Sequence, residues 1–231
     1  KGFGYCYHAA MARESTRARK VRLEEIHNRL YGEFPDPQCA LLHKNPFELL
    51  IATILSAQCT DKKVNDVTPF LFERYECAAD FAAASLEDLE FAIRSIGLFR
   101  SKAKNIRQCC QLLLERHQGE VPQTMEELIS LPGVGRKTAN VVLGNAFGKN
   151  EGIVVDTHVN RISNLLGLTS SKTPEKIERD LIKIVPRTEW TNISHLLILH
   201  GRKTCIARRP RCSQCPLTQL CPAGQDRTVL A

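Results

Sequence analysis

Leu131-Pro132-Gly133-Val134-Gly135 separates two stretches with helical spacing, residues 124–130 and 135–147. Two glycines two positions apart between helices predict a tight hairpin whose backbone amides can point outward. Outward amides at the start of a helix attract anions, and such a site can hold a phosphate without reading a base. A plain helix–helix turn would use the same residues, so the pentapeptide alone leaves both interpretations open.

Helical spacing continues on both sides of this hairpin. Apolar residues recur at helical intervals from Val21, and Pro46 can open a buried helix over residues 47–55. Two pairs have the spacing of capping boxes, Ser85 with Asp88 and Thr124 with Glu127. Further helices are predicted over residues 62–75, 85–94, 101–117, 157–166, 174–185 and 191–201. The only strand-like run, residues 153–155, is too short to build a sheet, so the predicted fold is all-α.

The composition is that of a globular protein with a basic surface. The 231 residues are 43% hydrophobic and 25% charged, and the formal net charge of +7 favours polyanionic partners. No apolar run approaches the roughly 20 residues of a membrane span, and residues 1–20 lack the apolar stretch of a secretory signal. Six of the ten cysteines have no framework spacing, which favours a reducing cytoplasm over a disulfide scaffold (Cys6, Cys39, Cys59, Cys77, Cys109 and Cys110).

The other four cysteines predict a metal site. Cys205, Cys212, Cys215 and Cys221 have the spacing C-x6-C-x2-C-x5-C. Zinc is the usual metal for four cysteines, but zinc ribbons pair two C-x2-C units, and only one is present, so the spacing favours an iron–sulfur cluster. Residues 201–225 contain no acidic residue and carry Arg208, Arg209 and Arg211, so we expect the loop to face an anion such as nucleic acid.

Lys137 is a candidate nucleophile. It would lie in the first turn of the helix after the hairpin, where the helix dipole and partial burial both favour the neutral amine. A neutral lysine can attack a sugar C1′ and form a Schiff base, whereas a charged one would bind a phosphate, and spacing alone favours the second role.

Asp156 is a candidate catalytic carboxylate. It closes the apolar run 153–155 and opens a helix, which is the usual position of an N-cap. A semi-buried carboxylate there can also assist proton transfer or stabilise an oxocarbenium-like sugar. His158 is interpreted as an orienting or core histidine, and His195 and His200, five apart on one helix, as packing residues.

Taken together, these segments resemble the endonuclease III family, the helix-hairpin-helix DNA glycosylases with a [4Fe-4S] cluster. The resemblance runs from about Val21 to Cys221 and is carried by residues 56–61 (SAQCTD), 96–99 (IGLF), 131–142 (LPGVGRKTANVV), 155–158 (VDTH), 197–202 (LILHGR) and the cysteine spacing.

The resemblance assigns a role to each site. It implies Lys137 as the Schiff-base nucleophile, Asp156 as the catalytic carboxylate, Gln58 as the residue that fills the gap left by the flipped base, and Leu98 as a wedge in the opposite strand. It implies [4Fe-4S] ligation by the four cysteines, and DNA contacts by the hairpin and the cysteine loop through Gly133, Gly135, Arg136, Arg208, Arg209 and Arg211.

The implied architecture has two helical lobes. One is a six-helix lobe of residues 39–150, the other is an iron–sulfur lobe of residues 21–38 and 151–231, and residues 1–20 form a flexible basic arm outside the family pattern. Damaged or abasic duplex DNA would bind across the cleft, with Lys137 and Asp156 on opposite walls. Cys59 stands where the family often has Ala or Thr, which makes it a candidate for tuning the lesion pocket.

The implied activity is that of a bifunctional base-excision enzyme. A monomer in the cytoplasm, associated with the nucleoid if bacterial, would remove oxidised or ring-saturated pyrimidines and cleave the strand by β-elimination. Adenine excision opposite oxidised guanine is the enzymatic alternative, although that sister family lacks the lysine nucleophile. A hairpin-plus-metal module that binds DNA without catalysis is the other alternative.

Overall fold

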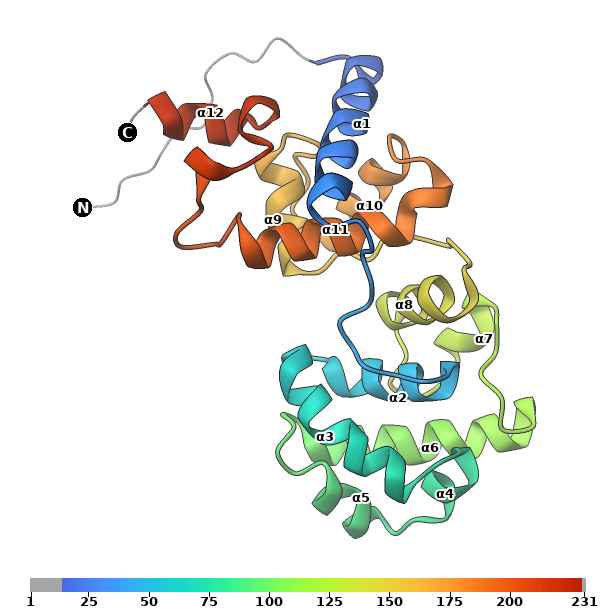
Figure 1. Ribbon diagram of the computed structural model, residues 1–231. Coiled ribbons are helices and arrows are strands. Elements are labelled where there is room, and N and C mark those ends of the chain that lie inside the picture. The colour runs from blue at the N-terminus through green and yellow to red at the C-terminus, as the bar shows by residue number, and fades with distance from the viewer. Residues whose placement is uncertain (1–13, 230–231) are drawn as a thin grey trace. The chain divides into compact units, whose positions relative to one another are not determined.

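The computed structural model describes residues 14–229, with side chains through residue 225. Within this range the regular structure is entirely helical, which confirms the all-α fold class. Two compact units are present (Figure 1). The hairpin unit comprises Gln38–Val154 and Arg187–His195, and the cysteine-loop unit comprises the described residues up to Pro37, Val155–Pro186 and the described residues from Leu196 onward.

The hairpin unit is built around α2 (Pro46–Ser56), a helix buried along almost its whole length. Asn45 caps it by accepting a hydrogen bond from the Glu48 amide at 2.8 Å, and Pro46 occupies the first helical position. Its neighbours in the unit are α3 (Asp61–Arg74), α4 (Ala78–Ala83), α5 (Leu86–Ala92), α6 (Phe99–His117), α7 (Met125–Ile129), α8 (Arg136–Phe147) and the 3₁₀ turn η1 (Arg187–Glu189).

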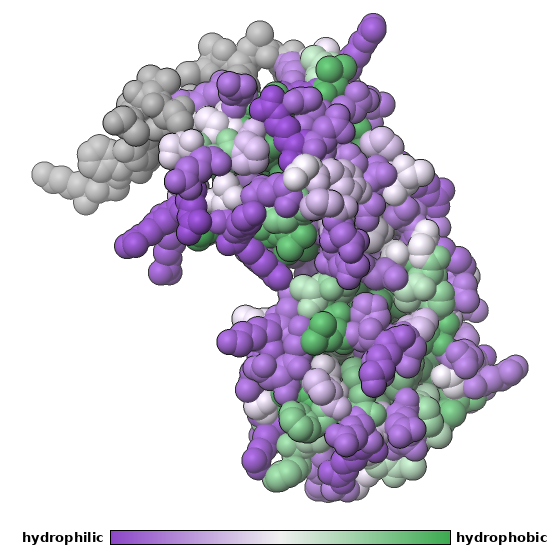
Figure 2. Space-filling view, viewed as in Figure 1, coloured by the Kyte–Doolittle hydropathy of each residue, from purple (hydrophilic) through white to green (hydrophobic). Residues whose placement is uncertain are grey.

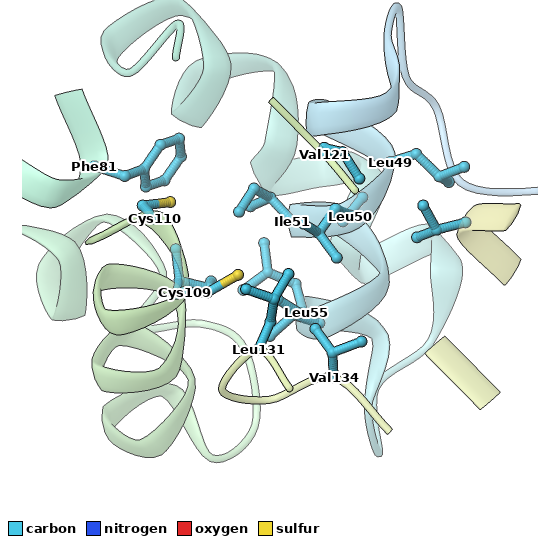
Figure 3. Close-up of a cluster of buried hydrophobic side chains, with 14 of the residues drawn as sticks. Leu49, Leu50, Ile51, Leu55, Phe81, Cys109, Cys110, Val121, Leu131 and Val134 are labelled. Carbon is cyan, nitrogen blue, oxygen red and sulfur yellow. The ribbon is translucent and has the colours of Figure 1, made fainter. Parts of the chain in front are cut away.

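The core of this unit fixes the hairpin between α7 and α8. Figure 3 shows α2 side chains, among them Leu50 and Leu55, in one cluster with Cys109 of α6 and with Leu131 and Val134 of the hairpin. Leu131 is 3% exposed and Val134 is 6% exposed. Burying one such side chain stabilises the fold by about 1.5–3 kcal/mol, so these two apolar residues hold the hairpin against the core of its unit.

The cysteine-loop unit begins with α1 (Thr16–Glu33), which buries Leu23, Ile26 and Leu30. Its other elements are α9 (Thr157–Leu165), α10 (Pro174–Ile182), the later part of α11 (Trp190–Lys203), the 3₁₀ turns η2 (Cys212–Gln214) and η3 (Thr218–Leu220), and α12 (Pro222–Val229).

Two arginines of α1 tie the cysteine loop to the rest of its unit. Arg22 Nη1 donates to the carbonyls of Leu166 at 2.6 Å and Leu220 at 3.1 Å, and Arg29 Nη1 donates to the carbonyl of Pro216 at 2.9 Å. These bonds satisfy loop carbonyls that belong to no helix ladder.

Several helix boundaries follow the sequence patterns, and others do not. Ser85 and Thr124 cap α5 and α7, as their spacing predicts. The predicted helix start at Val21 is wrong, because Ser15 caps α1 and the helix begins at Thr16. Residues 16–20 of the expected flexible arm are therefore helical, and residues 1–13 lie outside the described range.

Two short helices, α4 and α12, were not expected from the sequence. The N-cap of α4 is Cys77, an unusual residue for this position, and the Asp80 carboxylate accepts from the Glu76 and Cys77 amides at 2.9 and 3.1 Å. Among the helices in residues 14–229, none has the length and apolar character needed to cross a membrane.

Candidate functional site

The turn of the hairpin needs a glycine at position 133. Gly133 has φ = +80°, and a Cβ placed there would lie 3.0 Å from Asn105 Cβ and 3.4 Å from Ile54 Cγ2. The second glycine, Gly135, is the N-cap of α8 and has extended backbone angles. Both glycines are exposed, and within the described chain their amides donate no backbone hydrogen bond outside helices. The hairpin therefore presents amides at the positive end of α8, as an anion site requires.

Lys137 lies in the first turn of α8, directly after this anion site. Its side chain is exposed, so the expected partial burial is wrong. The exposed amine therefore lies close in the chain to the exposed hairpin glycines, and its role as the nucleophile stays a prediction. Arg136, the preceding residue, is exposed as well.

Asp156 caps α9 in the cysteine-loop unit. Its Oδ1 accepts from the Val159 amide at 2.8 Å, and its side chain is half-buried. One carboxylate oxygen thus holds the helix start, while no described residue is bonded to the other. The capping role and a catalytic role are compatible in this geometry. The expectation that Asp156 faces Lys137 stays a prediction.

Gln58 and Leu98 share a rare backbone conformation. They have φ = +53° and φ = +58°, and the described chain contains only one other non-glycine residue with positive φ, Gln118. Both side chains are exposed, and Leu98 is 58% exposed despite being apolar. Left-handed backbone at a non-glycine residue carries strain, which commonly accumulates where a side chain must be aimed.

The Gln58 and Leu98 loops are neighbours within the hairpin unit. A Cβ placed on Gly97 would lie 3.7 Å from the Gln58 carbonyl oxygen. On the face shown in Figure 2, hydrophobic and hydrophilic residues both reach the surface of this unit. The two loops therefore lie close together, and each carries one exposed side chain, polar in Gln58 and apolar in Leu98.

The four predicted ligands Cys205, Cys212, Cys215 and Cys221 line one cavity. All four are free thiols, and the cavity walls between them are mostly apolar, with contributions from Ile162, Leu165, Leu166 and Leu217. Among the described residues, no three His, Cys, Asp or Glu side chains converge closely enough to hold a single metal ion. Four thiols that surround a cavity without meeting at a point fit a multi-atom cluster better than one zinc ion.

The surroundings of these thiols also fit a cluster. Burial raises the pKa of Cys215 and raises that of Cys221 to about 11, so a thiolate there needs a positive partner such as iron. Arg161 Nη1 donates to Cys205 Sγ at 3.4 Å, and the Leu217 amide donates to Cys215 Sγ at 3.4 Å. Hydrogen bonds of this kind stabilise ligating sulfurs.

His200 is buried, as a packing residue would be, and it also lies beside one of the predicted ligands. It is 2% exposed, its Nε2 lies 3.7 Å from Cys215 Sγ, and its Nδ1 lies 3.8 Å from Glu33 Oε2. Burial lowers the pKa of His200, so the ring is neutral near pH 7. Neither His200 nor Arg161 could be found from spacing, because each contacts a cysteine at least 15 residues away in the chain.

The basic side chains of the cysteine loop point away from the fold. Arg208, Arg209 and Arg211 are exposed, and within the described residues none of the three forms an ion pair. The Arg211 amide donates to the Thr204 carbonyl at 3.0 Å, which closes the loop at its base. The loop thus holds three unpaired cations on a constrained backbone.

Two protein-family models match the segments that carry these sites. Residues 51–187 match the model of the HhH-GPD superfamily base excision DNA repair proteins, and residues 205–221 match the iron–sulfur binding domain of endonuclease III. The first match contains the hairpin, Lys137 and Asp156. The second begins at Cys205 and ends at Cys221, so the chain carries an iron–sulfur cluster, [4Fe-4S] as in its relatives.

The curated relatives agree with these family-model matches. The chain is 51% identical over 208 residues to endonuclease III of a Synechocystis strain, covering 90% of this chain and 95% of the relative. It is 46% identical over 202 residues to endonuclease III of Escherichia coli K12, covering 87% and 95%.

Two similar structures contain DNA. A non-covalent endonuclease III–DNA complex is 48% identical with a TM-score of 0.86, covering 91% of this chain and 98% of that one. A trapped covalent endonuclease III–DNA intermediate is 48% identical with a TM-score of 0.85, covering 90% and 98%. The chain therefore belongs to the endonuclease III family, the base excision repair DNA glycosylase/AP lyases of the HhH-GPD superfamily.

Proposed function

We propose that this enzyme removes oxidised or ring-saturated pyrimidines from duplex DNA and cleaves the strand by β-elimination through a Lys137 Schiff base. The observation that carries the proposal is the position of Lys137, exposed in the first turn of α8 directly after the phosphate-binding amides of Gly133 and Gly135. A phosphate held by those amides brings the adjacent sugar within reach of the amine.

The chemistry requires one amine and one carboxylate. Lys137 Nζ attacks C1′ of the sugar, the C1′–N bond to the base breaks, and the base leaves with a proton. The sugar ring opens to an imine between Lys137 and C1′, a proton is lost from C2′, and the 3′ phosphate departs as the C3′–O bond breaks. The free oxygen of Asp156 is the candidate for assisting proton transfer and stabilising positive charge at C1′.

Gln58 and Leu98 would act before the chemistry. A base must leave the stack before an enzyme can reach its sugar, which costs a few kcal/mol and less for a damaged base. The polar Gln58 side chain can occupy the vacated space and bond to the orphaned partner base, while Leu98 inserts as an apolar wedge. Their exposure and their neighbouring positions on one unit support this division of work.

The cysteine loop would hold the DNA backbone. Cys205 and Cys212 would both be ligands of the cluster, and this ligation would fix both ends of the segment that carries Arg208, Arg209 and Arg211. A fixed loop loses little conformational entropy on binding, so its cations are effective phosphate contacts. We further propose that the protein acts as a monomer in the reducing cytoplasm, in keeping with the free thiols of all the described cysteines.

Borohydride trapping on abasic duplex DNA tests the mechanism. The wild-type protein should form a covalent complex and Lys137→Gln should not, while binding of the abasic DNA stays within about tenfold because only the nucleophile is removed. Lys149→Gln is the matched control, since Lys149 is exposed just beyond the other end of α8. Trapping by Lys137→Gln at the wild-type yield would show that another amine is the nucleophile.

A further inference from the structure

Lys102 is a buried lysine that the chemistry above does not use. It lies in α6, four residues after Leu98, and is 4% exposed. Its Nζ donates to the Leu55 carbonyl at 2.9 Å, three residues before Gln58. Its backbone amide donates to the Leu98 carbonyl at 3.1 Å. One residue is therefore bonded both to Leu98 and to the segment that leads into Gln58.

The position of this ammonium is costly, and α2 compensates part of the cost. Lysine is almost never fully buried, and in the first turn of α6 its charge opposes the dipole of its own helix. The Leu55 carbonyl, however, lies in the last turn of α2, where carbonyls lack helical partners and the dipole is negative. Desolvation lowers the pKa of Lys102, and the Cys59 thiol acts in the opposite direction.

The two segments joined by Lys102 are the strained ones. Gln58 and Leu98 both hold left-handed backbone angles, which a non-glycine residue keeps only when its surroundings impose them. The two loops are close neighbours, since a Cβ placed on Gly97 would be in ordinary van der Waals contact with the Gln58 carbonyl oxygen, at 3.7 Å. The hydrogen bond of the Lys102 side chain to the Leu55 carbonyl links α6 directly to the last turn of α2.

We propose that Lys102 is a positioning residue that holds Gln58 and Leu98 together for insertion into DNA. This inference rests on the proposed function of those two residues. In this role Lys102 contacts neither the sugar nor the leaving base. Its loss should therefore slow base extrusion, and should slow bond cleavage less at a site that has already lost its base.

The test is a double-mutant cycle on single-turnover rates. Lys102→Met keeps the length of the side chain and removes the ammonium, and Lys104→Met is the matched control because Lys104 is exposed on the same helix. Excision of an oxidised pyrimidine by Lys102→Met should slow about tenfold, and borohydride trapping on preformed abasic DNA by less than about threefold. Lys104→Met should change neither.

The second arm of the cycle uses Gln58→Ala. In that background Lys102→Met should slow excision by no more than about twofold, because the residue it positions is gone. Fluorescence of 2-aminopurine placed opposite the lesion should report less unstacking with Lys102→Met than with the wild type. Lys102→Gln, which keeps a buried amide donor, replaces Lys102→Met in the cycle if calorimetry shows the latter to be unfolded.

Two results would overturn the inference. Additive effects of the Lys102 and Gln58 substitutions would mean that they act independently, and equal slowing of excision and trapping would indicate a general structural effect. A wild-type protein that neither excises nor traps would overturn the proposed function itself, and this inference with it.

Discussion

Replacing Gly133 with alanine should destabilise the hairpin unit by about 2–5 kcal/mol. An L-residue in left-handed backbone costs about 1–2 kcal/mol, and Gly133 has φ = +80°. The added methyl would lie 3.0 Å from Asn105 Cβ, well inside the usual carbon–carbon contact of roughly 3.5–4.0 Å, and overpacking of this kind costs about 1–3 kcal/mol. At roughly 2–4 °C per kcal/mol, the melting temperature should fall by about 4–20 °C.

Gly148→Ala separates the two contributions. Gly148 also has positive φ, +64°, but a Cβ there meets nothing within 4 Å, so only the backbone cost of about 1–2 kcal/mol applies. Calorimetry should show a smaller loss for Gly148→Ala, and Asn105→Gly should recover part of the loss in the Gly133→Ala background. Abasic-site DNA should bind more weakly to Gly133→Ala alone. Equal melting temperatures for the two alanine variants would refute the close approach of the hairpin to α6.

Four other outcomes are expected. Asp156→Asn should slow single-turnover excision by about two to four decades, yet change stability by no more than about 1 kcal/mol because asparagine also caps helices; a near-normal rate would leave Asp156 as a cap alone. Replacing Arg208 and Arg209 with alanine should weaken binding of lesion and undamaged DNA alike and reduce the salt slope by up to about 0.9 per lost phosphate contact, whereas parallel salt lines with equal intercepts would remove the loop from the interface. Burial lowers the pKa of His195 in the folded protein, so below the unfolded-state pKa of about 6.5 the unfolded chain binds more protons than the folded one. The free energy of unfolding should therefore decrease as the pH drops below about 6.5, and calorimetry of His195→Gln should show a flatter dependence of stability on pH. Purified protein should be yellow-brown and contain iron, and one zinc without iron would contradict the cluster assignment.

The sequence predicted the features that depend on local chemistry. Ser85 and Thr124 cap helices through their own neighbours, and Gly133 marks a turn whose positive φ few other residues permit. α4 was not predicted, because cysteine is not a usual N-cap and the helix is only six residues long. The exposure of Lys137 was not predicted either, because periodicity places a residue on a helix without showing what covers it.

Contacts between distant residues were beyond such reasoning. Lys102 meets a carbonyl 47 positions earlier, and Arg161 meets a cysteine 44 positions later. A lysine in an amphipathic pattern is ordinarily assigned to solvent, so its burial can be seen only once α2 and α6 are packed together.

The composition of the two units has a consequence for synthesis on the ribosome. The hairpin unit is nearly continuous in the chain. Most of it is Gln38–Val154, and a single segment separates this stretch from the remaining nine residues, Arg187–His195. The cysteine-loop unit instead needs α1 to meet residues from Leu196 onward, as the bonds of Arg22 and Arg29 show. During synthesis, α1 therefore leaves the ribosome well before these partners, and the cysteine loop can close on α1 only after the hairpin unit has been made.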